Sequence, residues 1–482
     1  MNRPSSAGSP SWPTPAEKGQ QKVIAKGVKP AVLSACKRAG SLSEAIGQKL
    51  SPDQKILASV LGVWCAVIAL NTQFTILGSQ EATNVFCLLL LVAPLLIVGP
   101  NRGFKNGLRL FTFGNRNPKA LLIWVFIGCA AWSAAFSGAA LASVGYLAAT
   151  VIGFLAFGEL HSRLGASGFV YLMRVYSSVG AIAVLGTLIL HGFTGTITGR
   201  LTLGPGDHPN HFGLVCWSIL CAALAWESII VKSGLVSLML AFMSQAESRT
   251  VLIASAVSLA IYPLVRYRKL WQRALLPSMA VIALIVVNTI WPGRIMDTVS
   301  SILMLNDKYR GAGSGLAGRA EQLPVALDLI AASPLLGHGY HVQNTYLPQG
   351  LLEIGAFHNG YIGLIVEIGF LGAVPLFYLI GIGVVSLWRK AWLSSSCAVE
   401  FALVAGYLVY VTAQPYLINQ TNPASALFWT ALCGALLRKM PQKQQRRVVG
   451  INVPSSFRPP RLYPSERRAQ MRQIASAARA SE

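Results

Sequence analysis

Apolar residues occur in this chain in long, nearly uninterrupted runs, unlike the three-to-four residue periodicity of helices in water-soluble proteins. Of the 482 residues, 53% are hydrophobic and only 12% are charged. A helix needs about 20 mostly apolar residues to cross roughly 30 Å of hydrocarbon. The runs therefore predict an all-α polytopic integral membrane protein.

Polar residues, glycines and prolines divide the apolar runs into about twelve predicted transmembrane helices. The second run is short, and the tenth is long enough to tilt or to kink at Pro375. The predicted spans lie at residues 56–77, 84–99, 119–136, 139–158, 168–190, 211–227, 229–246, 249–266, 272–291, 359–388, 398–416 and 423–438.

The net charge of +23 would suggest a nucleic-acid partner in a soluble protein, but in a membrane protein basic residues report topology. With a cytoplasmic N-terminus, 33 of the 40 lysines and arginines fall in cytoplasmic segments. We therefore expect both termini in the cytoplasm and no nucleic-acid partner. Arg174 lies inside a span, and six basic residues fall on the outer side: Arg200, Arg249, Arg294, Lys308, Arg310 and Arg319.

Three regions follow from this topology. Residues 1–55 and 439–482 are basic tails, which we expect to be disordered and held near anionic lipid, and residues 56–438 form the transmembrane domain. An outer loop at 292–358 is too long for a simple connection. Within it, Leu323 to Ala332 is predicted to form an amphipathic surface helix with Arg319 near its start. Arginine at a helix N-terminus interacts unfavourably with the positive end of the helix dipole, so a bound anion there would offset this repulsion.

The few charged side chains on the outer side carry most of the functional information, because charge is expensive in a membrane protein. Arginine presents a planar fork to phosphate oxygens, so Arg200, Arg249 and Arg319 together can hold a diphosphate. His358 can remove a proton from an attacking hydroxyl at neutral pH, and Asn359 can position a sugar or the imidazole ring. These groups suit transfer from a lipid diphosphate to a hydroxyl.

No Asp-x-Asp pattern occurs in the chain, and the outer carboxylates are isolated. The predicted site therefore uses no metal and no cofactor, with arginines in the role of a divalent ion. Each residue also has a structural alternative. Arg200 and Arg249 can be snorkelling side chains near span ends. Likewise, Arg319 can be a solvated loop charge and His358 an interfacial histidine that caps the tenth span.

Four segments resemble, in order, the motifs of the bacterial O-antigen ligase and polysaccharide polymerase family. They are Arg200 to Pro209-Asn210; Ser248-Arg249-Thr250; Gly318-Arg319 followed by Pro334 and Gly337-His338-Gly339; and His358-Asn359-Gly360-Tyr361 followed by Glu367, Gly369 and Gly372. Together they cover roughly residues 195–375. The sequence departs from the pattern after Arg319, where the family's usual aromatic residue is absent.

The resemblance implies a GT-C-like glycosyltransferase of the bacterial inner membrane whose active site faces the periplasm. The implied donor is an undecaprenyl-diphosphate-linked glycan, used without a metal. By the same resemblance His358 is the general base, while Arg249 and Arg319 hold the diphosphate and stabilise it as leaving group. Arg200 matches a less defined element of the same site, and Asn359, Tyr361 and Asn210 are supporting residues.

Three functions remain open from the sequence. We favour a polymerase for O-antigen or exopolysaccharide, because the outer loops suggest no dedicated site for a bulky lipid acceptor. The first alternative is a ligase that passes the glycan to lipid A-core of lipopolysaccharide or another surface acceptor. The second alternative is a flippase or transporter. Such proteins usually have midplane polar residues and internal repeats, and the sequence shows neither in this chain. Chain-length regulators or assembly proteins are possible partners of the basic tails.

Overall fold

A computed structural model describes most of the predicted transmembrane region. The described residues are 50–70, 80–98, 103–112, 118–190, 196–197, 200–203, 208–267, 315–347, 356–415, 417–419 and 422–437. Both predicted tails, apart from residues 50–55, lie outside these ranges, as do the predicted span at 272–291 and the first part of the long loop.

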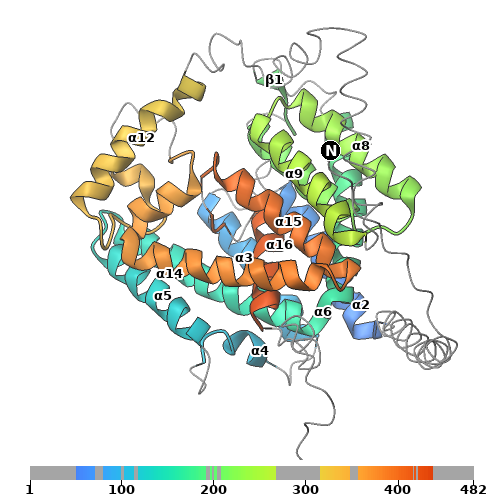
Figure 1. Cartoon of the computed structure of the whole chain (residues 1–482), viewed down its shortest axis with the longest axis horizontal. Helices are drawn as coiled ribbons and strands as arrows, with labels where there is room; N and C mark the ends of the chain where they lie inside the picture. Colours follow the sequence, from blue (N-terminus) through green and yellow to red (C-terminus); the bar gives the residue numbers. More distant parts are fainter. Residues whose placement is uncertain are drawn as a thin grey trace, which may run out of the picture. The chain divides into compact units, whose positions relative to one another are not determined.

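The described chain is almost entirely helical, in agreement with the predicted class (Figure 1). In chain order the elements are α2 (Pro52–Ala69), α3 (Gln80–Ile97), α4 (Lys105–Leu108), α5 (Pro118–Ala135), α6 (Ala140–Leu190), β1 (Thr196–Ile197), β2 (Arg200–Leu201), α7 (Pro209–Ala223), α8 (Ile229–Gln245), α9 (Arg249–Arg266), α12 (Gly315–Ala332), the 3-10 turn η5 (Gln343–Thr345), α14 (Gly360–Ala391), α15 (Ser395–Val411) and α16 (Pro423–Leu437). The only strands in the described part are β1 and β2, which pair antiparallel as a two-residue ribbon.

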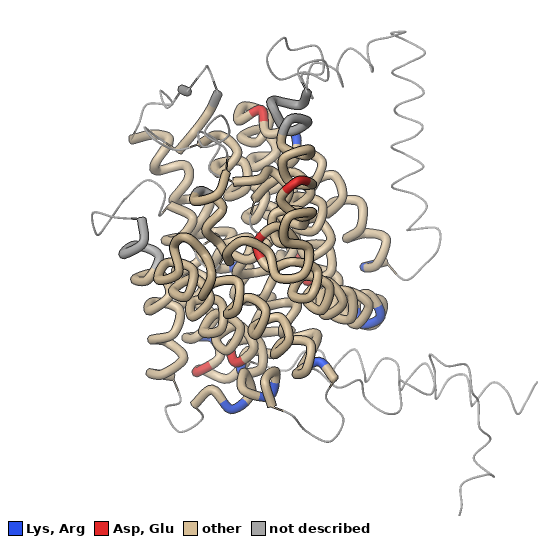
Figure 2. Tube along the Cα trace, turned by 90° about the vertical axis from the view of Figure 1, so that its left-hand side faces the viewer, with Lys and Arg blue, Asp and Glu red and all other residues tan. Residues whose placement is uncertain are grey.

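Five of the described helices, α2, α5, α6, α9 and α14, are long and apolar enough to cross a membrane. Figure 2 shows how little of the described trace carries Lys, Arg, Asp or Glu. Several shorter apolar helices, among them α8, α15 and α16, match predicted spans in position. The structure thus supports a helical membrane protein, whereas the count of about twelve spans remains a prediction.

Two of the long helices are interrupted by a glycine in the left-handed region of backbone space. Gly165 (φ 64°, ψ −174°) divides α6 between the predicted spans at 139–158 and 168–190. Gly369 (φ 65°, ψ 179°) divides α14 into a short segment before it and a long one after it. The sequence placed the kink of this span at Pro375, but the non-helical residue is Gly369. A proline removes one hydrogen bond donor, whereas a positive φ redirects the backbone itself.

The structure also corrects the first residue of two predicted helices. The first helix begins at Pro52 instead of residue 56, because Ser51 forms a capping box with Gln54 and proline is well suited to the first helical turn. In the long loop, the helix predicted from Leu323 begins at Gly315 and includes Pro324, so Arg319 lies within it.

Helix α6 is the centre of the packing. It contacts α2, α5, α7 and α16 along its length, while α9 packs along α15, and α14 packs against α5 and α15. Large side chains such as Trp217, Tyr176, Phe428 and Trp429 are fully buried between these helices. A second, smaller apolar cluster of Ala326, Leu347, Phe357 and Val366 joins α12 to α14.

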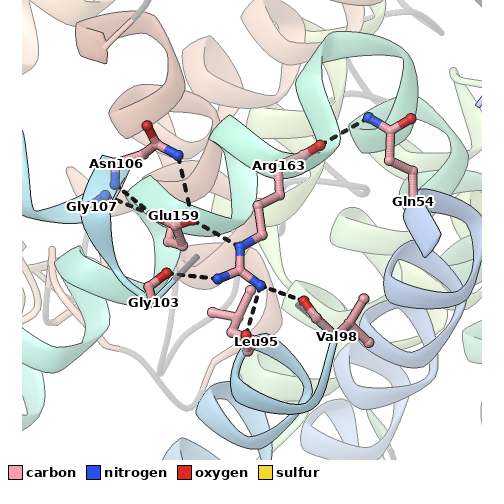
Figure 3. A network of polar contacts seen from close by, with 8 residues as sticks. All are labelled: Gln54, Leu95, Val98, Gly103, Asn106, Gly107, Glu159 and Arg163. Atoms are coloured by element: carbon pink, nitrogen blue, oxygen red, sulfur yellow. Dashed lines mark hydrogen bonds and ion pairs between the residues drawn. The ribbon is translucent and has the colours of Figure 1, made fainter. Parts of the chain in front are cut away.

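A buried ion pair within α6 ties three elements together (Figure 3). The Arg163 Nε donates to Glu159 Oε1 at 2.8 Å, and the guanidinium also donates to the carbonyls of Leu95, Val98 and Gly103. The Glu159 carboxylate accepts hydrogen bonds from the backbone N–H groups of residues 106 and 107 at the start of α4. Because a buried charge is tolerated only with such partners, this cluster holds α3, α4 and α6 in register.

We predict that Arg163→Met destabilises the protein by roughly 3–5 kcal/mol, because it leaves Glu159 as a buried charge without its cation. Arg174→Met is the matched control, since the partner of Arg174, Glu227, is 88% exposed. This exposed pair should contribute at most about 1 kcal/mol. Thermal unfolding of both variants in detergent measures the difference, and equal unfolding temperatures would contradict the role given to Arg163.

Candidate active site

The end of the long loop docks through its backbone onto the break in α14. The N–H groups of His338 and Gly339 donate to the carbonyls of Val366 and Glu367, at 3.0 and 3.1 Å. In return, the N–H groups of residues 370 and 371 donate to the carbonyls of residues 334 and 335, at 2.8 and 3.3 Å. A break leaves carbonyls before it and N–H groups after it without helical partners. The loop supplies four of these partners, so loop and helix form one unit.

Glycines make this close approach possible. A β-carbon at Gly369 would overlap the backbone of Leu335, and one at Gly337 would overlap the backbone of Glu367. Both residues also have a positive φ, which non-glycine residues rarely adopt. The Gly337-x-Gly339 pattern and Gly369 had been associated only through the family resemblance. In the structure they lie in the two backbone segments that contact each other at the break in α14.

His358 lies two residues before the first residue of α14, directly after the buried residue Phe357. Its side chain is half-buried, and its backbone N–H donates to Gln322 Oε1 of α12 at 2.9 Å. The predicted base thus stands at a junction between the long loop, α12 and α14.

Asn359 and Tyr361 have defined structural contacts next to His358. The side-chain oxygen of Asn359 accepts hydrogen bonds from the N–H groups of residues 361 and 362, both at 3.1 Å, so Asn359 is the N-cap of α14. The Tyr361 hydroxyl donates to the Leu408 carbonyl of α15 at 2.8 Å. Both residues therefore fix the direction in which the chain leaves His358.

Arg249 is the first residue of α9, where a tight turn reverses the chain after α8. Glu247 in this turn has φ 52°, an uncommon conformation for a residue with a side chain. Arg249 itself is half-buried and follows the buried Ser248. A cation at the positive end of a helix is unfavourable without an anion nearby, so this position suits a binding residue.

The remaining predicted site residues fall on nearby elements. Arg200 is paired with Ile197 in the β ribbon, and β2 contacts α7 and α8. Asn210 is the second residue of α7, and its backbone N–H donates to His208 Nδ1 at 3.1 Å. Arg319 lies in the first half of α12, upstream of Gln322. The side chains of Arg200 and Arg319 are outside the description.

The structure thus gathers the predicted residues into two groups. Arg200, Asn210 and Arg249 belong to the group of β2, α7 and α9, and Arg319, His358, Asn359 and Tyr361 belong to that of α12 and α14. Helix α15 connects the groups, because it packs against both α9 and α14.

The two other histidines of this loop have structural roles. The Nε2 atoms of His338 and His341 lie 2.7 and 2.8 Å from the carbonyls of Leu329 and Ile418. Burial lowers the pKa of His341 to about 4, so this ring is neutral at physiological pH. Tyr340 between them is fully buried and bonds to Thr150 of α6, and burial raises the pKa of its hydroxyl. This region anchors the loop on α6.

The sequence assigned no site role to three buried polar residues around His358: Gln322, Gln343 and Glu367, which are 5%, 1% and 3% exposed. Glu367 was noticed only as part of a family motif. Its position within a predicted span was the available signal, because a carboxylate there requires dedicated partners. The glutamines carry no such signal, since an uncharged polar residue in a loop is unremarkable.

Long apolar helices that pack around α6, with polar residues gathered at the start of α14, define a helical membrane protein with one elaborate loop site. Residues 234–377 of this protein match the family model described as O-antigen ligase. This match supports the resemblance to the O-antigen ligase and polymerase family seen in the sequence. Arg249, Arg319, His358, Asn359 and Tyr361 lie inside the matched segment, and Arg200 and Asn210 precede it. No curated protein matches the chain.

We predict that Gly369→Ala strongly destabilises the protein, because alanine disfavours a positive φ and its methyl group would overlap the docked loop. Gly381→Ala is the matched control in the same helix, because a β-carbon there meets open space. Alanine is favoured over glycine inside a helix by about 1 kcal/mol, so the control should be neutral or stabilising. Thermal unfolding in detergent tests this contrast, and a shift of the same sign and size in both variants would refute it.

Proposed function

We propose that this protein is a glycan polymerase of the bacterial inner membrane. It transfers glycan from an undecaprenyl-diphosphate carrier to a hydroxyl of an acceptor glycan on the periplasmic side, with both termini in the cytoplasm. The observation that carries the proposed glycan transfer is the position of His358: half-buried just before α14, inside the matched segment, and joined through its backbone to the helix that contains Arg319.

The proposed reaction needs only side chains. His358 removes the proton from the acceptor hydroxyl, and the oxygen attacks the anomeric carbon of the donor glycan. A bond forms between that oxygen and the anomeric carbon as the bond from the carbon to the diphosphate oxygen breaks. Arg249 and Arg319 stabilise the departing diphosphate, with Arg200 as a further cation. Because fixed guanidinium groups compensate the negative charge, the reaction as proposed uses no metal.

A ligase that delivers the glycan to lipid A-core or another surface acceptor is the second candidate. The matching family is described as O-antigen ligase, and the match does not distinguish the two acceptors. Both candidates share the donor and the proposed base. They differ in which product is missing when the protein is absent.

The size distribution of lipid-linked and surface glycan tests the proposal in a deletion strain complemented with wild type, His358→Ala or Arg319→Ala. We expect loss of the polymer ladder and retention of single repeats in the deletion strain. His358→Ala should lower the rate by about 10²–10⁴-fold, and Arg319→Ala by about 10²–10³-fold.

Arg174→Ala, which removes an exposed ion pair, is the control and should retain the wild-type ladder. Protein levels in the membrane fraction must be equal for all variants. Long polymer that accumulates on the lipid carrier in the deletion strain would identify the ligase instead. A normal ladder with His358→Ala would refute the assigned base.

A further inference from the structure

Two glutamines from different elements hold the backbone at His358. Gln322 Oε1 of α12 accepts the N–H of His358 at 2.9 Å, and Gln343 Oε1 of η5 accepts the N–H of Phe357 at 2.7 Å. Consecutive backbone donors just before a helix are therefore satisfied by side chains instead of water. Because both glutamines are more than nine-tenths buried, loss of either acceptor would leave a donor without a replacement.

Glu367 determines which way the Gln343 amide points. The Nε2 of Gln343 donates to Glu367 Oε1 at 2.6 Å, and the Glu367 carboxylate also accepts the backbone N–H of His341. The amide nitrogen must face the carboxylate, so the amide oxygen must face Phe357. This chain of hydrogen bonds runs from α14 through η5 to the residues in front of His358.

The same elements connect His358 to the proposed diphosphate site. Arg319 precedes Gln322 by one helical turn on α12, and Ala326, further along α12, packs with Phe357 and Val366. The position of α12 therefore determines the position of the His358 backbone as well as that of Arg319. A general base must lie within hydrogen-bonding distance of its proton, so a small displacement is costly.

We propose that Gln322 and Gln343 are positioning residues for His358, and that Glu367 orients Gln343 for this task. The inference rests on the proposed function, because it takes His358 as the base. Its consequence is a specific effect on turnover: disruption lowers kcat about 10- to 100-fold and changes the KM for the donor much less.

Reversal of the hydrogen bond between residues 343 and 367 provides the sharpest test. Gln343→Glu places two carboxylates against each other. In Glu367→Gln, the new amide N–H₂ must face another donor, which is either the amide of Gln343 or the backbone N–H of His341. In the double variant Gln343→Glu/Glu367→Gln, the glutamate accepts from Phe357 and from the new amide, whose oxygen accepts from His341. Every donor is again satisfied, with the same net charge as the wild type.

The experiment measures kcat, KM and thermal unfolding of the purified full-length protein, with lipid-linked glycan extracted from the deletion strain as donor. We expect both single variants to lose turnover and the double variant to recover it to within about threefold, a free-energy difference below about 1 kcal/mol. Gln322→Leu should lower kcat as the single variants do. Asp328→Ala, at an exposed position of the same helix, should leave kcat unchanged.

Three results would overturn the positioning role. They are a double variant no more active than the singles, single variants with wild-type kcat, and variants that lose thermal stability but keep turnover per folded molecule. His358→Ala in the same assay separates this failure from failure of the proposed function. If His358→Ala is active, His358 is not the base and the proposed function fails. If His358→Ala is inactive while the glutamine variants keep wild-type kcat, only the positioning role fails.

Discussion

The fold depends on one constraint: backbone polar groups removed from water must find partners. A break in a membrane helix is tolerated only where other protein groups pair with the freed carbonyls and N–H groups. At Gly369 the long loop supplies them, with two glycines that allow the backbones to meet. The same docked loop carries η5, so that Gln343 bonds both to Glu367 of α14 and to the backbone of Phe357 in front of His358.

Hydropathy predicted most of the described helices well, because a long apolar run has few alternatives to a helix in a bilayer. It did not predict where α14 breaks. Pro375 was the stronger local signal, but the break at Gly369 is determined by a loop segment more than 25 residues upstream in the sequence. Arg163 was counted only as a topology signal, although its side chain is 6% exposed and bonded to three carbonyls. Contacts distant in sequence decide both features.

The candidate site was predictable to the extent that charge is conspicuous in an apolar chain. Arg249, Arg319 and His358 stood out for this reason, and the matched family segment includes all of them. The neutral residues that hold His358 did not stand out. Asn359 was predicted to position a sugar or the imidazole ring, which stays a prediction. Its side-chain oxygen caps α14, a contact that could not be predicted without knowing where the helix begins. Neutral residues that hold a site residue in place can be recognised only from the three-dimensional structure.

The Glu159–Arg163 cluster also affects the order in which parts of the protein can fold during synthesis. Each backbone partner of this ion pair, from Leu95 to Gly107, precedes Glu159 in the sequence. A nascent chain emerges from its N-terminus, so the cluster can close before the segment 234–377 is synthesised. The site is instead completed last, since Tyr361 bonds to Leu408 and His341 to Ile418. The ion pair can therefore form in the growing chain before the segment that contains the candidate site is added.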